Sequence, residues 1–379
     1  MRNLIVGLVA TLALTAVAAN SSTIADRYHR AAEVNAACFF RAPDHTTYVS
    51  TGDINAMWLR DSSVQAMSQL QNRDLVRGVI LRQERMIRSD PYANAFHRDY
   101  MVAERKFEID SLCYPVKLAD RYVEETGDTT IYDAAYHATL VRILDTLNIE
   151  QRHADLSTYH RNEHPVANGT GLIWSAYRPS DDPVAYNFNV PENAFAAVTL
   201  RGMSKTFASV YADDANANTA LLMAQRIESG ISRLAVLPTG HGRMYAYEID
   251  GLGHAKFMDD ANMPSLLSLP LLGFAYDAQA YTSTRAFVLS SANPYYYHGR
   301  YAEGVGSPHT PANFVWPMSL VVQYRTAKNE PERGRVVREL VNSDPGDGAL
   351  HESFDVNDPR RYTRERFGWV NALFEQTFR

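Results

Sequence analysis

Cysteine is scarce in this sequence, because only Cys38 and Cys113 occur among its 379 residues. A chain of this length, with 46% hydrophobic residues, buries a core that needs no disulfide framework. The composition therefore excludes a small scaffold held together by disulfides. The two thiols either pair in an oxidising compartment or stay free and buried, and the sequence leaves both possibilities open.

Runs of basic residues are also missing. The 37 Lys and Arg residues are outnumbered by 43 Asp and Glu residues, which gives a formal net charge of −6. Nucleic-acid phosphates and anionic membrane surfaces attract protein faces that are rich in Lys and Arg. We therefore expect no nucleic-acid partner and no membrane partner.

The one long apolar run lies at the N-terminus. Arg2 precedes an apolar stretch over residues 4–17, which is short for a membrane span and ends in the small-residue pattern Ala16-Val17-Ala18. This predicts a cleaved signal peptide over residues 1–18 and a secreted, lumenal or periplasmic protein; an uncleaved anchor is the alternative. Asn20 and Asn168 begin N-glycosylation sequons, which matter only in a glycosylating host.

Several catalytic motifs are absent. The sequence has no Gly-x-Ser-x-Gly nucleophile elbow, no Gly-rich phosphate loop and no His-Glu-x-x-His metal motif. Its twelve histidines show no ligand spacing, and the stretch 342–353, faintly similar to a calcium loop, contains Pro345 and ends in Ser353 instead of Glu. We expect metal-independent chemistry without a cofactor.

What the sequence does contain is helical periodicity. Apolar residues recur at helical spacing within 75–87, 195–210, 221–234, 336–341 and 367–374, whereas strictly alternating strands are scarce. Six segments rich in Asp, Trp, Arg, Asn, Pro and Gly lie between helices: 51–62, 90–114, 174–193, 258–265, 293–317 and 350–366. A ring of helices whose loops gather at one end produces this pattern. No hinge divides residues 19–379, so we expect a single all-α domain.

The segment 51–62 combines two carboxylates, a guanidinium and an indole. Asp53, Trp58, Arg60 and Asp61 are costly to bury unless they are paired or bind a ligand. A purely structural Arg60–Asp61 ion pair, with Trp58 in the core, is the alternative.

Two further segments hold closely spaced acids. Glu108 and Asp110 are candidates for a site, and a helix start stabilised by acidic residues is the alternative. Asp181 and Asp182 are adjacent in a loop that Pro179 and Pro183 stiffen. Adjacent acids repel each other, which favours the protonated form that a general acid needs. A solvated Asp-Pro turn is the alternative here.

The remaining segments add polar groups beside aromatic rings. Sugar hydroxyls need polar partners and the apolar faces of sugar rings stack on aromatics, so this composition indicates a sugar site. The residues concerned are Arg178, Asp260, Asn262, Asn293, Tyr295, His309, Trp316, His351 and Glu352.

Taken in order, these motifs resemble those of glycoside hydrolase family 125, the exo-acting α-1,6-mannosidases. The resemblance is carried by residues 51–62 (TGDINAMWLRDS), 90–96 (DPYANAF), 107–115 (FEIDSLCYP), 178–182 (RPSDD), 259–270, 293–296, 306–310 (GSPHT) and 351–354 (HESF). It extends over residues 51–374. The stretch between residues 40 and 48 is shorter than the family pattern leads us to expect, which puts closure of the helix ring in question.

The resemblance implies an (α/α)6 toroid that removes terminal α-1,6-linked mannose from glycans or mannan, with inversion and without a metal. It implies a general acid at Asp181 or Asp182 and a general base at Glu352. Of the two aspartates Asp182 is preferred. Asp181, directly after Ser180, is expected to bond back to its own loop as turn residues do, and Pro183 biases Asp182 towards an extended conformation. The walls of the mannose site are then Asp53, Trp58, Arg60, Asp61, Glu108, Asp110, Arg178, Asp260, Asn262, Asn293, Tyr295, His309, Trp316 and His351.

We expect the protein to act as a monomer. A mannan-binding protein without activity is one rival function. The other is a toroid hydrolase for a different α-linked sugar, of the α-glucosidase or trehalase type.

Overall fold

The structure is a computed structural model that describes residues 23–379. The predicted signal peptide over residues 1–18 and the sequon at Asn20 lie outside the described residues, whereas Asn168 is exposed in a turn. Within the described part of the chain, each helix is too short or too polar to cross a membrane.

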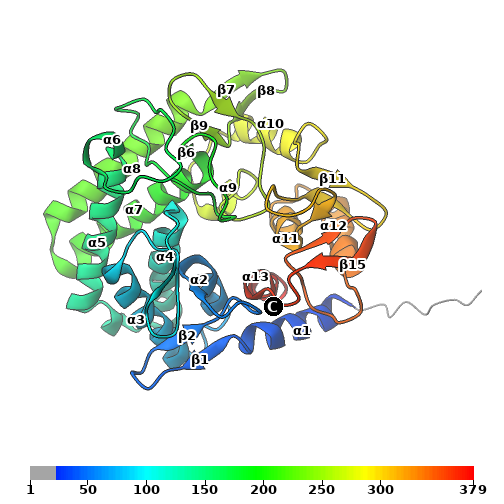
Figure 1. The fold of residues 1–379 in the computed structure, drawn as a ribbon, viewed down its shortest axis with the longest axis horizontal. Coiled ribbons are helices and arrows are strands. Elements are labelled where there is room, and N and C mark those ends of the chain that lie inside the picture. Colours follow the sequence, from blue (N-terminus) through cyan, green and yellow to red (C-terminus); the bar gives the residue numbers. More distant parts are fainter. Residues whose placement is uncertain (1–22) are drawn as a thin grey trace, which may run out of the picture.

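Helices alternate along the described chain between an inner and an outer ring (Figure 1). The inner helices are α2 (Leu59–Met67), α4 (Ile109–Thr126), α7 (Val190–Tyr211), α9 (Leu269–Leu272), α11 (Pro317–Arg325) and α13 (Gly368–Phe378). The outer helices are α1 (Ile24–Ala36), α3 (Arg73–Ser89), α5 (Ala134–Glu150), α8 (Asp214–Leu234), α10 (Ala278–Val288) and α12 (Glu330–Asn342). The short helices α6 (His153–Leu156) and η1 (Thr129–Ile131) lie in connections. This confirms the predicted (α/α)6 toroid.

Burial differs between the two rings. In α2 every residue over 59–66 is buried, and in α13 every residue over 368–375 is buried, because other elements surround these helices. The buried hydroxyl of Ser63 donates to the Leu59 carbonyl 2.7 Å away, so that its own helix satisfies it. The outer helix α3 instead buries one stripe that includes Val76, Val79 and Ile80, as its periodicity predicts.

Helix α1 and the last helix close the ring. Helix α1 packs against α13 and α12, and α13 packs in turn against α2. The fully buried Arg27 of α1 donates to the Ala349 carbonyl at 3.0 Å and to the Ser343 hydroxyl at 3.3 Å. The short stretch 40–48 forms a tight hairpin. The ring is therefore complete at this end, which answers the question raised by the sequence.

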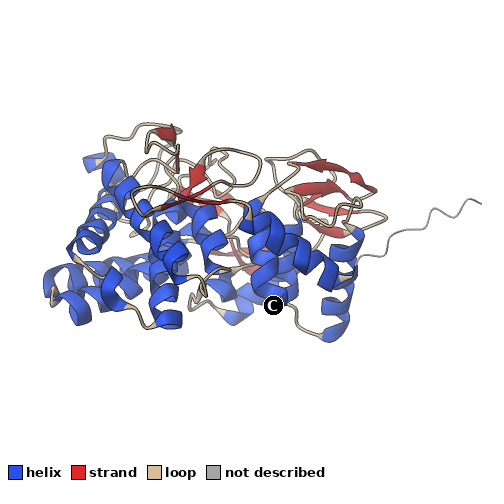
Figure 2. Cartoon of the chain, turned by 90° about the horizontal axis from the view of Figure 1, so that it is seen from below, coloured by secondary structure: helices blue, strands red, loops and turns tan. Residues whose placement is uncertain are grey.

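The segments that connect the helices form small antiparallel sheets, mostly on one side of the rings (Figure 2). The strands are β1 (Phe39–Arg41), β2 (Thr47–Val49), β3 (Met57–Trp58), β4 (Ala95–Phe96), β5 (Val102–Glu104), β6 (Phe188–Asn189), β7 (Val236–Thr239), β8 (Gly242–Tyr245), β9 (Glu248–Ile249), β10 (Ala255–Lys256), β11 (Tyr296–His298), β12 (Glu303–Val305), β13 (Phe314–Val315), β14 (Ser353–Asp355) and β15 (Asp358–Thr363). Most are two or three residues long, too short for alternation to reveal them in the sequence. They join loops that are distant in sequence, as where Val315 of β13 pairs with Phe354 of β14.

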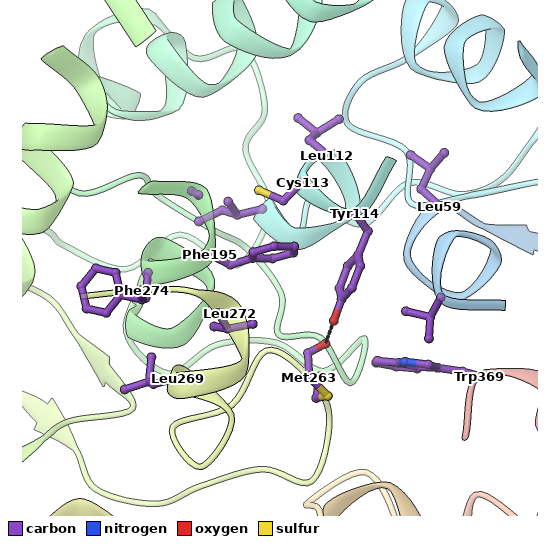
Figure 3. Close-up of a cluster of buried hydrophobic side chains, with 14 of the residues drawn as sticks. Leu59, Leu112, Cys113, Tyr114, Phe195, Met263, Leu269, Leu272, Phe274 and Trp369 are labelled. Atoms are coloured by element: carbon purple, nitrogen blue, oxygen red, sulfur yellow. Dashed lines mark hydrogen bonds between the residues drawn. The ribbon is translucent and has the colours of Figure 1, made fainter. Parts of the chain in front are cut away.

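An apolar layer fills the centre of the rings (Figure 3). Leu59, Tyr114, Phe195 and Trp369 reach it from four different inner helices, and all are buried. The Tyr114 hydroxyl donates to the Met263 carbonyl at 3.5 Å. This layer lies inside the ring, below the loops.

The two cysteines are free and buried. Cys38 donates to the Val34 carbonyl at 3.3 Å, and burial raises the pKa of the Cys113 thiol well above its usual range. Of the two possibilities left open by the sequence, the structure therefore shows the free thiols.

Candidate active site

A cavity of about 340 Å³ lies among the loops at one end of the ring. Each of the six polar segments predicted from the sequence contributes to its wall. The predicted site residues that line it are Trp58, Arg60, Asp61, Asp181, Asn262, His309, Trp316 and Glu352. A larger cavity of about 530 Å³ between α5, α6 and α8 contains none of the predicted site residues.

The loop before α2 is fastened to the C-terminal part of the chain. Gly52 adopts φ +98°, and a Cβ atom there would lie 2.3 Å from the Arg366 carbonyl oxygen, so glycine is required. Asp53 accepts from Nε of Arg364 at 2.8 Å, and the Asp53 amide donates to the Arg366 carbonyl at 3.1 Å. Asp53 thus holds a cavity-lining arginine, although it does not line the cavity itself.

Arg60, on the first turn of α2, is surrounded by carboxylates. Its Nη1 lies 2.7 Å from Glu108 and 3.5 Å from Asp110, its Nη2 lies 3.3 Å from Asp181, and its Nε lies 3.4 Å from Asp61. Burial acts to lower the pKa of Arg60, but these carboxylates outweigh burial and raise it well above its usual value. The structural alternative of a simple Arg60–Asp61 pair therefore describes only part of this network.

One guanidinium cannot neutralise four carboxylates, so some of them hold protons. Burial, together with the charge of Asp181, raises the pKa of Glu108 well above its usual range. Burial also raises the pKa of Asp110 to about 6 and raises that of Asp61. Asp61 accepts from the Thr51 hydroxyl at 2.5 Å through its other oxygen, Oδ1. The network therefore contains one carboxyl group, that of Glu108, whose pKa favours the neutral form beside the cavity.

The two adjacent aspartates point to different partners. Asp181, at φ +64°, lines the cavity and accepts from Arg60 at 3.3 Å and from Nδ2 of Asn94 at 3.2 Å. Asp182 accepts from the Ser180 hydroxyl at 3.0 Å and lies 3.1 Å from Nδ1 of His309. Asp182 is thus the aspartate bound to its own loop, whereas sequence reasoning expected this of Asp181. Burial acts to raise the pKa of Asp181, but Arg60, the hydrogen bond with Glu108, Lys106 and His309 together outweigh burial and lower this pKa.

His309 and Trp316 form another part of the wall. The hydrogen bond with Asp182 raises the pKa of His309 to about 9, so the imidazole is cationic at neutral pH. Trp316 is held in place by the Thr310 hydroxyl, which accepts from its Nε1 at 2.9 Å. The two rings meet edge to face with centroids 6.3 Å apart.

Glu352 lines the same cavity as Arg60 and directly precedes β14. It is only 6% exposed, and burial raises its pKa, while Arg364, Thr363 and His309 act in the opposite direction. A buried carboxylate with its pKa closer to neutrality is suited to general base catalysis.

Two predicted residues, Arg178 and Asp260, are buried and do not line the cavity. Nε of Arg178 lies 2.5 Å from Glu248. Burial acts to lower the pKa of Arg178, but Glu248, Tyr247 and Asp260 together outweigh burial and raise it. Asp260 accepts from Nδ2 of Asn262 at 2.9 Å and thereby orients a side chain that lines the cavity.

Asn293, Tyr295 and His351 are further predicted residues that do not line the cavity. Asn293 donates to the Val288 carbonyl and accepts from backbone amides, including that of Tyr295, so it shapes its own loop. His351 stacks on Tyr362 with centroids 3.6 Å apart. Its Nδ1 lies 3.0 Å from the carbonyl oxygen of Arg364. His351 therefore contacts the backbone of Arg364, whose side chain lines the cavity.

Sequence reasoning also missed parts of the wall. The additional lining residues are Thr51, Ile54, Glu104, Lys106, Pro179, Ser180, Arg364, Phe367 and Trp369. Lys106 pairs with Glu104 at 2.8 Å. Trp369 had a signal in the sequence, because it is one of four tryptophans and lies within the periodic stretch 367–374.

Comparison with known sequences identifies the family. The sequence model described as metal-independent alpha-mannosidase (GH125) matches residues 10–378. The meiotically up-regulated gene 157 protein of Schizosaccharomyces pombe is 36% identical to the chain over 386 residues, which cover 87% of the chain and 75% of that protein.

Comparison with solved structures agrees. A metal-independent α-mannosidase of Streptococcus pneumoniae, in a non-productive substrate complex with α-1,6-mannobiose, is similar with a TM-score of 0.88 and 36% identity, over 94% of this chain and 93% of that one. Glucoamylase of Saccharomycopsis fibuligera shares only the fold, with a TM-score of 0.64 and 11% identity over 97% of each chain. The chain therefore belongs to glycoside hydrolase family 125, the metal-independent α-mannosidases.

Proposed function

We propose that the protein removes single mannose residues from the non-reducing ends of α-1,6-linked glycans or mannan, with inversion at the anomeric carbon. The observation that carries this proposal is that Asp181 and Glu352 line one cavity of the (α/α)6 ring. The linkage is supported by the relative from S. pneumoniae, which was solved with α-1,6-mannobiose.

Exo action is supported by the size and floor of the cavity. Its volume of about 340 Å³ is at the small end of the range, about 300–1,000 Å³, that is typical of ligand pockets. Trp369 lines this cavity and also a separate one on the other side of the apolar layer, so the layer closes the floor. A pocket with a closed floor admits the end of a sugar chain and excludes its middle.

Polar atoms without partners in the wall support a ligand rich in hydroxyls. Nε1 of Trp58, Oδ2 of Asp61 and Nε1 of Trp369 are buried and have no hydrogen-bond partner among the described residues. Hydroxyl groups can both donate to carboxylates and accept from indoles. The ring of Trp58, which is only partly buried, offers an apolar face for stacking against the sugar.

In the proposed reaction, Asp181 protonates the leaving glycosidic oxygen. Free Asp181 is ionised beside Arg60, but neighbouring Glu108 holds a proton, so the pair retains one proton between them. Binding of the sugar excludes water and favours transfer of this proton to Asp181. Asp182, the aspartate preferred from the sequence, is the alternative acid, and it lies 3.1 Å from Nδ1 of His309.

Glu352 is the proposed general base. In its ionised form it takes a proton from a water molecule, which attacks the anomeric carbon from the face opposite the leaving group. An inverting mechanism requires the two carboxyl groups to lie about 6.5–9.5 Å apart, with room for that water. Because burial raises the pKa of Glu352, we expect activity to fall as pH drops through this raised pKa.

The test is incubation with α-1,6-mannobiose, followed by NMR of the first product before mutarotation. Release of β-mannose supports the proposal, and release of α-mannose means retention and contradicts it. A panel of α-linked disaccharides separates the rivals: glucose without mannose indicates an α-glucosidase or trehalase activity, and binding without cleavage indicates a mannan-binding protein. Activity is expected to survive extensive chelation.

We also propose that residues 1–18 direct export and that the mature protein acts as a monomer. The apolar run 4–17 and the small residues before Ala19 support the first part. N-terminal sequencing of exported protein tests it, and light scattering in solution tests the second part. A mature chain that still begins with Met1 contradicts cleavage.

A further inference from the structure

A group of metal-ligand side chains lies outside the cavity, in the connection between α5 and β6. His153, His160 and Glu163 each offer one ligand atom, and these atoms all lie within 4.8 Å of one another. Nε2 of His153 is 2.9 Å from Oε1 of Glu163, and Nδ1 of His160 is 2.7 Å from the same oxygen. None of the three lines the candidate active site.

The first of these histidines is held rigidly. Nδ1 of His153 lies 2.5 Å from Oε2 of the buried Glu150, whose other oxygen accepts from the Tyr92 hydroxyl at 2.7 Å and the Ser157 hydroxyl at 2.6 Å. The ring of Trp174 stacks on His153 with centroids 3.7 Å apart. A carboxylate that binds the far nitrogen of a histidine is the usual support of a metal-ligating imidazole, because it fixes the tautomer and the ring orientation.

We propose that His153, His160 and Glu163 bind a divalent transition-metal ion, foremost Zn²⁺, with water as the fourth ligand. Two imidazole nitrogens and one carboxylate oxygen form a ligand set that suits Zn²⁺, whereas Ca²⁺ and Mg²⁺ require mainly oxygen ligands. The site is separate from catalysis and does not depend on the proposed function.

The present spacing needs only a small adjustment to admit the ion. Ligand atoms about 2.0–2.1 Å from a tetrahedral Zn²⁺ lie about 3.3 Å apart, somewhat more than the 2.7 and 2.9 Å now observed. The side chains of His160 and Glu163 are 64% and 44% exposed, so they are free to move outward. His153 remains fixed and provides the anchor.

Metal binding would stabilise the chain segment that precedes the loop of Asp181 and Asp182. Between the ligands, Asn162 donates to the Ala176 carbonyl at 3.4 Å, and its own carbonyl accepts from Nδ2 of Asn187 at 2.9 Å. Ala176 lies five residues before Asp181 in the sequence. We therefore expect Zn²⁺ to raise the melting temperature without being needed for turnover.

The experiment is calorimetric titration of chelator-treated full-length protein with Zn²⁺. One equivalent should bind to the wild type and to the control His164→Gln, which changes an exposed histidine outside the group. Glu163→Gln and His160→Gln should lose the site. Glu150→Gln, which removes only the supporting charge, should weaken affinity by about 10–100-fold.

A second readout locates the ion. Paramagnetic Co²⁺ bound at this site should quench the fluorescence of Trp174 in the wild type and in His164→Gln but not in Glu163→Gln, with mannosidase activity the same in all three. Equal Zn²⁺ binding by the wild type and Glu163→Gln, or loss of binding in His164→Gln, overturns the proposal. Displacement of Zn²⁺ by equimolar Ca²⁺ or Mg²⁺ also overturns it.

Discussion

The pairing of charged side chains differs between the two ends of the helix ring. At the loop end, the cations that line the cavity, Arg60, Lys106 and Arg364, each pair with a carboxylate. At the other end, a cavity of about 490 Å³ is lined by Lys117 and Arg325, which have no ion pair or hydrogen bond among the described residues. Acids outnumber their cationic partners at the loop end, whereas at the other end Lys117 and Arg325 lack an acidic partner among the described residues and only Arg121 and Arg379 have one.

The direction of the inner helices explains this difference. Helices α2, α11 and α13 begin beside the loop-end cavity, where Arg60, Trp316 and Trp369 lie in or just before their first turns, and they end beside the opposite cavity. Aligned helices place partial positive charge at their N-termini and partial negative charge at their C-termini. The parallel inner ring therefore stabilises carboxylates at the loop end and isolated cations at the other. The loop end is therefore the end suited to the proposed acid–base chemistry.

The largest effect is expected when the proposed general base at the loop end is replaced. Glu352→Gln keeps the shape of the side chain but cannot accept a proton, so we expect kcat to fall by about 10²–10⁴-fold, as is typical of a general acid or base. Stopped assays with α-1,6-mannobiose measure the loss, and circular dichroism checks that the variant is folded. A loss of less than tenfold would assign Glu352 to binding.

The same assay decides between the two aspartates. Because Asp181 lines the cavity and Asp182 does not, Asp181→Asn should show the larger loss of kcat. If Asp182→Asn is the more damaging, the acid is the aspartate preferred from the sequence, and Asp181 serves to orient Arg60.

The sequence predicts the ring and the composition of the site better than it predicts individual contacts. The periodic stretches 75–87 and 221–234 lie in outer helices, where one solvent face leaves a readable pattern. The short β hairpins leave no alternating pattern in the sequence. Their pairing nevertheless decides which loop side chains line the cavity, such as Arg364, and which do not, such as Asn293. Likewise, only the folded chain brings His160 and Glu163 to His153. Residue type can thus be inferred locally, whereas the direction of a loop side chain depends on distant strand pairing.

A third prediction concerns the stability of the loop end. Arg60→Met removes the cation that four buried or partly buried carboxylates share. Removing one partner of a buried ion pair typically costs about 3–5 kcal/mol of unfolding free energy. Urea unfolding measures this cost. Arg121→Met is the control, because its ion pair with Glu124 is exposed and contributes about 0–1 kcal/mol. Equal effects would contradict the shared network.

At the opposite end, the same kind of substitution should stabilise the protein. Burial, aided by Arg325 and Arg121, lowers the pKa of Lys117 to about 8. The folded state therefore binds fewer protons than the unfolded state between pH 8 and the usual lysine pKa of about 10.4, and stability of the wild type rises with pH in this window. Lys117→Met should raise the unfolding free energy by about 1–3 kcal/mol at pH 7, and the gain should shrink above pH 8. A gain that is independent of pH would contradict the electrostatic cause.

The smallest effect is expected at His309, the charged histidine of the loop end. Its hydrogen bond to Asp182 raises its pKa from 6.5 to about 9, so it contributes stability below pH 6.5 that is lost as pH rises through 9. The side chain is 38% exposed, so solvent screening limits the contribution to about 0.5–1 kcal/mol. Melting curves should show His309→Gln below the wild type at pH 6 and converging with it at pH 10. A gap that persists at pH 10 would mean that His309 acts through packing against Trp316, and the charge contrast between the ends would then rest on the carboxylates and arginines alone.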